Sequence, residues 1–244
     1  MRIHHHLFAL IASALCTQTI LAGVTITGTR IVFPSNQNTV TVQLNNAADK
    51  PALVQAWLDD GDENDIPDAD KIPFILTPPL TKVEANKGQM LRIISKGTEQ
   101  LAKDRESLFW FNILDIPSSE LKDSELEETN KLQVSIRSRI KLFYRPHQLK
   151  ISPDKAMNNV QFAYSKSAQT IHIKNPSPYY MSFWDLTINP EKEKIEYTEN
   201  LMIAPFSTEK IKLSNPTIPT QVKYNLINDF GANQIFKATI ESIE

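Results

Sequence analysis

Residues 39–45 read Thr-Val-Thr-Val-Gln-Leu-Asn, so the apolar side chains of Val40, Val42 and Leu44 alternate with polar ones. Such alternation is typical of a β-strand that has one face in a core and the other in solvent. The pattern returns in residues 169–174, and no sustained helical periodicity interrupts the series. The sequence therefore predicts an all-β fold.

Clusters of Asn, Asp, Pro and Lys divide the chain into short runs rich in Val, Ile, Thr and aromatic residues. A long run ends at Tyr144-Arg145-Pro146, where the proline blocks further ladder pairing. We therefore expect two immunoglobulin-like β-sandwich domains, residues 23–147 and 148–244, held at a fixed angle by a short linker. The predicted strands are 24–33, 39–45, 52–58, 73–76, 89–95, 108–115, 131–144, 160–164, 169–174, 180–188, 200–204, 208–213, 220–227 and 234–241.

The first residues have the composition of a secretory signal peptide. Met1-Arg2 gives a basic start, residues 7–14 are almost entirely apolar, and Ala22 is a small residue before the expected cut. Cys16 would carry the lipid of a lipoprotein, but the residue before it is not small. The sequence therefore predicts a signal peptide over residues 1–22 and an exported protein without a lipid anchor.

The overall charge and the cysteine content limit the class of protein. The 244 residues carry 26 Lys and Arg against 28 Asp and Glu, a formal net charge of −2. This balance argues against a nucleic-acid partner, because no basic excess is available to neutralise phosphates. The single cysteine, Cys16, lies in the expected signal peptide, so we expect the exported chain to fold without an intramolecular disulfide.

One predicted strand carries an apolar row whose partner the alternation does not identify. Leu132, Val134 and Ile136, with Ile140 further along, lie on one face of an extended segment. The row could pack in the core of its own domain. From alternation alone this first interpretation is favoured, but the row could also fill a groove in another protein if the strand lies at the edge of its sheet.

Five short blocks of the sequence share their order and spacing with one known family. The blocks are Thr29-Arg30-Ile31-Val32-Phe33, Asp104-Arg105-Glu106-Ser107-Leu108-Phe109-Trp110-Phe111-Asn112, Ile140-Lys141-Leu142-Phe143-Tyr144-Arg145-Pro146, Asn175-Pro176-Ser177-Pro178-Tyr179-Tyr180 and Ile227-Asn228-Asp229-Phe230-Gly231. They resemble the periplasmic pilus chaperone family of the chaperone-usher pathway, and the match extends across nearly the whole exported chain. The five blocks together are far more specific than any one of them.

The resemblance implies a boomerang of two immunoglobulin-like domains in the periplasm, with no catalytic centre, cofactor or nucleotide. The expected client is a pilus subunit, a pilin whose own sandwich lacks its last strand. The chaperone would lend a strand to fill that gap and would deliver the client to an outer-membrane usher for assembly into a fibre. The expected donor residues are Leu132, Val134, Ile136 and Ile140.

Arg30 and Lys141 match the two cations that grip the C-terminal carboxylate of the subunit in this family. A chain-end carboxylate in a cleft requires charge-assisted donors, and two of them also fix the register of the neighbouring strand. A lone Arg in a strand is usually a surface residue, so the assignment depends on the resemblance. Because Lys141 has the opposite parity to Val134 and Ile136, we expect a twist or a bulge to direct it into the cleft.

Glu106, Arg145 and Asp229 match a further family feature, an ion network that bridges the two domains. Each of the three alone would be interpreted as a surface charge. The resemblance implies that together they fix the angle between the domains. If they are buried together, removing any one of them is costly.

Three other interpretations account for less of the sequence. A secreted immunoglobulin-like adhesion or binding module explains the sandwiches but not the paired cations. An enzyme is disfavoured, because the exported chain has no Gly-x-Ser-x-Gly elbow, no nucleophilic cysteine and no metal cluster. The six aspartates of residues 59–70 are reminiscent of a calcium loop, but its glycine and closing glutamate are not at the required positions, so we expect a solvated turn.

Overall fold

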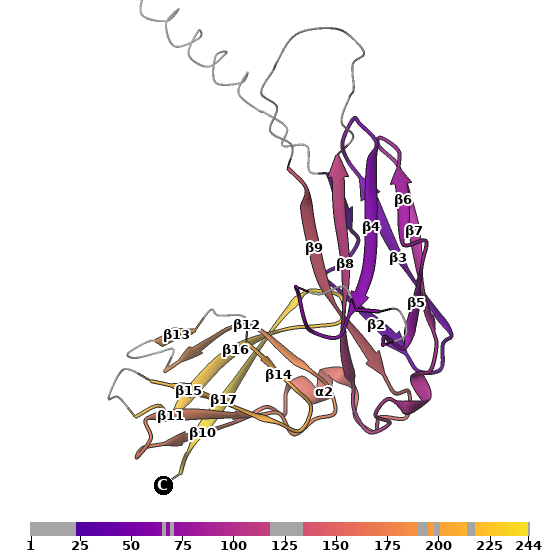
Figure 1. Ribbon diagram of the computed structural model, residues 1–244. Coiled ribbons are helices and arrows are strands. Elements are labelled where there is room, and N and C mark those ends of the chain that lie inside the picture. The colour runs from indigo at the N-terminus through magenta and orange to yellow at the C-terminus, as the bar shows by residue number, and fades with distance from the viewer. Residues whose placement is uncertain are drawn as a thin grey trace, which may run out of the picture.

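The computed structural model shows two β-rich lobes that meet at an angle, in the shape of a boomerang (Figure 1). The predicted all-β class with two sandwich-like domains is confirmed. The expected signal peptide, residues 1–22, lies outside the described residues. The structure describes residues 23–64, 67, 68, 71–117, 134–189, 195–197, 201–213 and 218–243.

Two sheets face each other in the N-terminal lobe. One has the strand order β1-β3-β7-β5, and the other has the order β2-β9-β8-β4-β6. Neighbouring strands are antiparallel except for β2 and β9, which run parallel. The elements are β1 (Val24–Ile26), β2 (Arg30–Pro34), β3 (Thr39–Asn46), β4 (Ala52–Asp59), β5 (Phe74–Thr77), β6 (Leu80–Val83), β7 (Gly88–Ser95), the short 3-10 helix η1 (Thr98–Gln100), β8 (Ser107–Pro117) and β9 (Ile136–Arg145).

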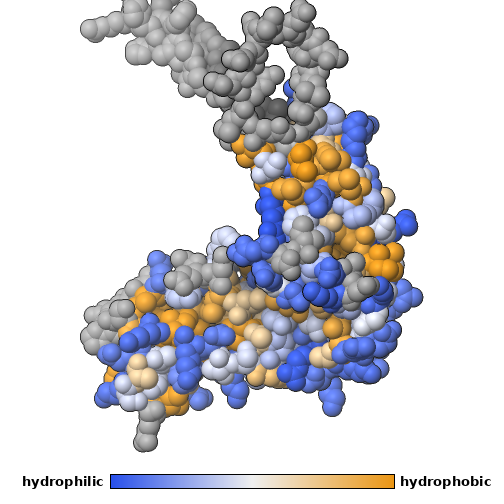
Figure 2. All heavy atoms as spheres, viewed as in Figure 1, coloured by the Kyte–Doolittle hydropathy of each residue, from blue (hydrophilic) through white to orange (hydrophobic). Residues whose placement is uncertain are grey.

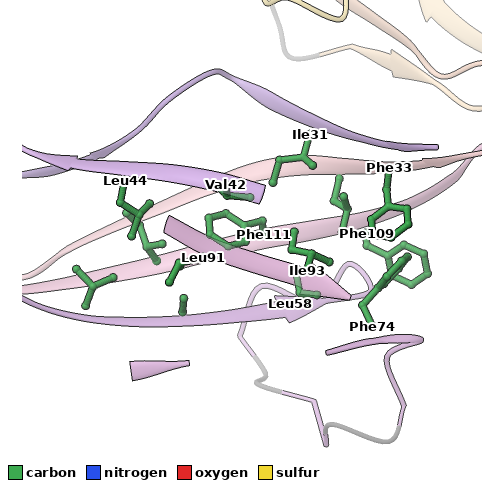
Figure 3. Packing of buried hydrophobic residues seen from close by; sticks show 14 of the residues in the cluster. Ile31, Phe33, Val42, Leu44, Leu58, Phe74, Leu91, Ile93, Phe109 and Phe111 are labelled. Atoms are coloured by element: carbon green, nitrogen blue, oxygen red, sulfur yellow. The ribbon is translucent and has the colours of Figure 1, made fainter. Parts of the chain in front are cut away.

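The core of this lobe fills the space between the two sheets (Figure 3). At one end Phe33, Phe74, Phe109 and Tyr144 form an aromatic cluster, with neighbouring ring centroids 5.1 to 6.1 Å apart. Each side chain of this kind contributes about 1.5–3 kcal/mol when it is buried. Since Leu142 and Tyr144 of β9 face this core, the residues that alternate with them, Lys141 and Phe143, face the other way.

The chain changes sheets between β1 and β2. We predicted one strand over 24–33, but β1 pairs with β3 in one sheet and β2 pairs with β9 in the other. The crossing includes Gly28, whose φ of 97° is a left-handed conformation that glycine adopts without strain. The prediction was wrong because this turn interrupts an otherwise regular alternation. The change of sheet places Arg30 at the first position of β2, beside β9.

The C-terminal lobe is one path of strands around its own core. Parallel pairing of β10 with β17 joins the series β13-β12-β16-β17 to β10-β11-β15, and β14 pairs with β12. Tyr224 lies at the centre of the core against Phe162, Phe183 and Phe236. The elements are α2 (Pro153–Met157), β10 (Gln161–Ser165), β11 (Thr170–Lys174), β12 (Met181–Ile188), β13 (Ile195–Tyr197), β14 (Met202–Ile203), β15 (Thr208–Lys212), β16 (Gln221–Ile227) and β17 (Asn233–Ile243).

Two strands of the structure were not predicted. β6 has four residues and β13 has three, which is too short for alternation to show.

Within the described part of the chain, no helix has the length and apolar character needed to span a membrane.

Candidate functional site

Arg30 and Lys141 are direct neighbours across the parallel pair β2 and β9. On its other side Lys141 is opposite Trp110 of β8. The three residues therefore form a row across adjacent strands, on the sheet face that points away from the core.

This row forms one wall of a cavity of about 430 Å³ between the two lobes. The surface is visibly hollowed at the inside of the angle where the lobes meet (Figure 2). The opposite wall belongs to the C-terminal lobe. It is formed by Trp184, Ile227, Gly231 and Asn233.

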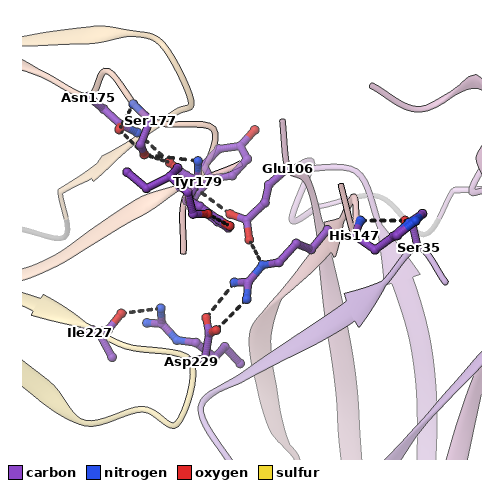
Figure 4. Close-up of polar contacts among 12 residues, drawn as sticks. Ser35, Glu106, His147, Asn175, Ser177, Tyr179, Ile227 and Asp229 are labelled. Atoms are coloured by element: carbon purple, nitrogen blue, oxygen red, sulfur yellow. Dashed lines mark hydrogen bonds and ion pairs between the residues drawn. The ribbon is translucent and has the colours of Figure 1, made fainter. Parts of the chain in front are cut away.

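The two cations in this cavity have few partners. Arg30 Nη1 donates a hydrogen bond to the carbonyl oxygen of Ile227 at 2.8 Å (Figure 4), and Lys141 Nζ donates to Ser182 Oγ at 3.2 Å. Nε of Arg30 is buried and has no hydrogen-bond partner among the described residues. Neither Arg30 nor Lys141 takes part in any ion pair among the residues that the structure describes.

Proton affinities respond to this arrangement. Burial lowers the pKa of Arg30. Burial, together with the positive charge of Arg30, lowers the pKa of Lys141 to about 8. Two positive charges on neighbouring strands repel each other in the free protein, and an anion bound between them would offset that repulsion. The row has the chemistry of a carboxylate-binding site.

Lys141 reaches the cavity without a distortion of its strand. We expected a twist or bulge, but β9 pairs with β8 in unbroken register from Ile136 to Tyr144, and with β2 from Lys141 to Arg145. The prediction was wrong because the cavity lies on the opposite face of the sheet from the core. Lys141 points into the cavity by ordinary alternation, while Leu142 points into the core.

The apolar row of this strand has two kinds of surroundings. Val134 and Ile136 are exposed, with 58% and 54% of their surface accessible, whereas Ile140 packs against the N-terminal core. Leu132 lies outside the described residues. Residues 136–140 pair with β8 on one side, but β2 begins to pair only at Lys141, so this half of β9 has a free edge within the described structure.

The structure brings Glu106, Arg145 and Asp229 together at the angle between the lobes (Figure 4). Arg145 Nε donates to Glu106 Oε1 at 2.7 Å, and Nη1 and Nη2 donate to the two carboxylate oxygens of Asp229 at 2.6 and 2.8 Å. The backbone N–H of Tyr180 donates to Glu106 Oε2 at 2.8 Å. These contacts connect β9 and the residue before β8 in one lobe with the residue before β12 and the β16–β17 turn in the other.

Burial and pairing act in opposite directions in this network. Burial raises the pKa of Glu106 although Arg145 pairs with it. Burial opposes the charge of Arg145, but the hydrogen bonds to Asp229 and Glu106 and the negative charges of both acids together outweigh that effect and raise its pKa. The network therefore depends on Arg145 to hold two acids beside each other.

A polar cluster around two buried side chains, Asp59 and Asn112, lies on the same sheet face and was not predicted. Asp59, at the end of β4, is fully buried and accepts hydrogen bonds from Arg139 Nη2 at 2.5 Å and from Asn112 Nδ2 at 2.6 Å. Asn112 Oδ1 in turn accepts from Arg137 Nη2 at 2.8 Å. We name Asp59, Asn112, Arg137 and Arg139 the Asp59 cluster.

The Asp59 cluster corrects the expectation of a solvated turn at Asp59 alone, since Asp60, Asp62 and Asp68 are exposed and residues 65 and 70 lie outside the described residues. Burial opposes ionisation of Asp59, but the hydrogen bonds from Arg139, Asn112 and the backbone of Gly61, together with the charge of Arg139, outweigh it and lower the pKa of the carboxyl. Sequence alone could not reveal this, because the cluster depends on the register that sets Asn112 opposite Arg139. Among the described residues, no group of three or more His, Cys, Asp or Glu side chains could hold a metal ion.

Two tryptophans extend the Asp59 cluster. The guanidinium of Arg139 lies 4.1 Å from the ring centroid of Trp110, and that of Arg137 lies 5.0 Å from the centroid of Trp57. These contacts tie the free-edge half of β9 to β8 and β4. They therefore hold the segment that bears the exposed side chains of Val134 and Ile136 against the sheet.

Comparison with known proteins matches each of the two lobes to a domain of one chaperone family. The family "Pili and flagellar-assembly chaperone, PapD N-terminal domain" matches residues 23–150, and "Pili assembly chaperone PapD, C-terminal domain" matches residues 155–237. The chaperone protein HifB of Haemophilus influenzae is 42% identical over 220 residues, which cover 90% of this chain and 89% of HifB.

Solved structures agree with these matches. The crystal structure of the YadV chaperone is 36% identical, with a TM-score of 0.74 over 89% of this chain and all of that one. A structure of the Salmonella enterica SafA pilin in complex with the SafB chaperone contains a chain that is 26% identical, with a TM-score of 0.74 over 91% of this chain and 98% of that one. The protein described here therefore belongs to the PapD family of pilus-assembly chaperones.

Proposed function

We propose that the protein binds pilus subunits in the periplasm and anchors the C-terminal carboxylate of each subunit between Arg30 and Lys141. The observation that carries this proposal is the pairing of two cations on adjacent strands, inside a cavity, without an ion-pair partner among the described residues. A chain-end carboxylate supplies the missing negative charge and can accept donors from both sides.

The same strand that holds Lys141 is suited to lend its edge to the subunit. Residues 136–140 expose an unpaired edge, and the exposed Val134 and Ile136 lie on its apolar face. A subunit that lacks a strand can hydrogen-bond along this edge and bury the apolar row, with Leu132 extending it. Each buried side chain contributes about 1.5–3 kcal/mol, from which the cost of ordering both partners is subtracted.

The carboxylate anchor and the lent strand act together. Because Lys141 follows the free edge on the same strand, a carboxylate held there sets the register in which the subunit pairs with residues 136–140. The ion network of Glu106, Arg145 and Asp229 keeps the lobes apart, so that the cavity between them stays open. The boundary between the two domains lies at residues 147 and 148. The SafA–SafB complex, in which a pilin is bound to a structurally similar chaperone, supports this assignment.

In this account the protein performs no catalysis. It would pass each subunit to an outer-membrane usher, and it would use no cofactor or nucleotide. Relatives named as chaperones over about nine-tenths of the chain support this role.

Co-expression with the secreted proteins encoded beside its gene tests the proposal. We expect a protein with a pilin-like, incomplete sandwich to be recovered from the periplasm as an equimolar complex with this chain, and to disappear when the chain is not expressed. Recovery of every candidate pilin in equal amounts with and without the chain would contradict the proposal.

A further inference from the structure

The strand β12 is interrupted by one extra residue, Trp184. Phe183 is opposite Leu226 of β16, but Asp185 is opposite the preceding residue, Asn225, so Trp184 has no partner across the ladder. Such a β-bulge re-aims the side chains around it. In β12 the core-facing positions change from odd to even numbers at this point, from Met181 and Phe183 to Leu186 and Ile188.

The bulge displays a large aromatic ring in the cavity. Trp184 is 59% exposed, which leaves most of an indole ring in water, and it lies in the wall opposite Trp110. Ser182, which accepts the hydrogen bond from Lys141, lies two residues earlier on the same strand. Two residues of a strand span ~7 Å, so the ring lies within a side chain's reach of the cation pair.

We infer that Trp184 is a specificity-determining residue, which receives the side chain of the subunit's last residue while Arg30 and Lys141 hold its carboxylate. This inference rests on the proposed function. The side chain and the carboxylate leave the same Cα atom, so a ligand anchored between the cations must place that side chain against the nearby walls. Trp184 offers it an exposed indole ring opposite the wall that contains Trp110, which favours an aromatic or large apolar group.

The charges around the cavity add a second criterion. Arg30, Lys141 and Arg139 all line it, and of these only Arg139 has an ion-pair partner within the described residues, namely Asp59. A subunit that ends in Lys or Arg would bring a further positive charge among them and would be rejected. The preferred last residue is therefore aromatic or apolar.

Short labelled peptides provide the test, with fluorescence anisotropy as the measurement. The peptides share one alternating Val-Thr sequence and end in Phe, Ala or Lys with a free carboxylate, and a fourth ends in Phe carboxamide. For the native protein we expect the order of affinity Phe, then Ala, then Lys. The Trp184→Ala variant should lose about tenfold in affinity for the Phe peptide, the size of one aromatic contact, and less than about twofold for the Ala peptide.

Two further variants serve as controls. Trp184→Phe keeps a ring in the bulge and should retain most of the preference for Phe over Ala. Phe230→Ala removes a ring that is 94% exposed and does not line the cavity, so it should leave all affinities unchanged. A circular dichroism spectrum and a melting temperature for each variant show that the fold is kept.

The outcomes separate this inference from the proposed function. If Trp184→Ala weakens the Phe and Ala peptides equally, or neither of them, the specificity role is wrong even when the carboxylate is required. If the Phe carboxamide binds as well as the Phe carboxylate, the anchoring function itself is wrong. A tenfold loss for Phe alone, with weak binding of the carboxamide, supports both.

Discussion

Arg145 and Asp229 form a two-point ion pair between the lobes, with Nη1–Oδ2 and Nη2–Oδ1 distances of 2.6 and 2.8 Å. The two residues are 84 positions apart in the sequence. A bidentate pair fixes orientation as well as distance, and the bond from Arg145 Nε to Glu106 adds a third direction. One guanidinium group therefore joins an acidic side chain of each lobe.

Replacing Asp229 with Ala should lower the free energy of unfolding by about 2 kcal/mol, because Arg145 loses two charge-assisted hydrogen bonds while it stays mostly buried. The range of angles that the lobes sample relative to each other should also widen, which small-angle scattering can measure. The control is Glu84→Ala, whose partner Lys82 is exposed, and it should change neither property. Unchanged unfolding and scattering in Asp229→Ala would show that the network does not set the angle.

Replacing Asp59 with Ala should destabilise the protein by about 3 kcal/mol, because Arg139 is then left largely buried without its carboxylate. Amide hydrogen exchange should accelerate in residues 136–140, which the Asp59 cluster ties to the sheet. Asp104→Ala is the matched control, since it removes an exposed carboxylate paired with Arg105 and should leave exchange unaltered. If exchange in residues 136–140 is the same in both variants, the cluster does not hold the free edge.

The same carboxylate predicts a pH dependence. Because the pKa of Asp59 is lowered in the folded protein, the stability it contributes is present above the ordinary carboxyl pKa and is lost as the pH falls through the lowered value. Acid unfolding of the native protein should therefore be steeper than that of Asp59→Asn. Equal steepness in both proteins would contradict the ionised state of Asp59.

Binding of a carboxylate should weaken as the pH rises through the pKa of Lys141, which is about 8. Lys141 loses its proton there in the free protein, while Arg30 stays charged, so affinity for a peptide carboxylate should fall about tenfold from pH 7 to pH 9. Lys141→Arg keeps a charge at both values and should remove the dependence. A native protein whose affinity is flat from pH 7 to pH 9 would exclude a role for the Lys141 charge.

Stability should respond to Lys141 in the opposite sense. The unfolded chain holds the lysine proton up to the ordinary pKa of 10.5, whereas the folded protein releases it near pH 8. The free protein should therefore gain stability as the pH rises from about 8. Comparison with Lys141→Arg isolates this gain, and an identical pH profile of melting temperature in the two proteins would argue against it.

Charge on the apolar row should separate folding from client binding. Val134→Asp and Ile136→Asp place a carboxylate at exposed positions, so the chaperone should fold normally while the recovery of clients falls sharply. Leu142→Asp, further along the same strand, places it in the core and should prevent folding. If folded Val134→Asp and Ile136→Asp variants recover as much client as the native protein, the apolar row does not bind the subunit.

The sequence predicted what depends on local pattern and missed what depends on register. Alternation such as that of Val40, Val42 and Leu44 was enough for the all-β class. It missed the change of sheet at Gly28, because one positive φ leaves no mark on hydrophobicity. It also missed the bulge at Trp184, since an extra residue is visible only when β12 is aligned with β16.

The candidate site shows the same division. Arg30, Lys141 and the ion network of Arg145 were identified by resemblance, and the structure places each group together. Asp59 was assigned to a solvated turn, because Asn112 and Arg139 are far from it in sequence and meet it only across the sheet. Long-range polar pairs of this kind have no local signal, whereas apolar strands do.

Client recovery with both anchoring cations replaced tests the central claim most directly. A folded Arg30→Ala, Lys141→Ala double variant, co-expressed with the pilin that the native chain stabilises, should yield almost no periplasmic complex and no surface fibres. Its own stability should be equal to or above that of the native protein, since two unpaired like charges are removed. Normal yields of complex and fibres from the double variant would contradict the proposed anchoring of the subunit carboxylate.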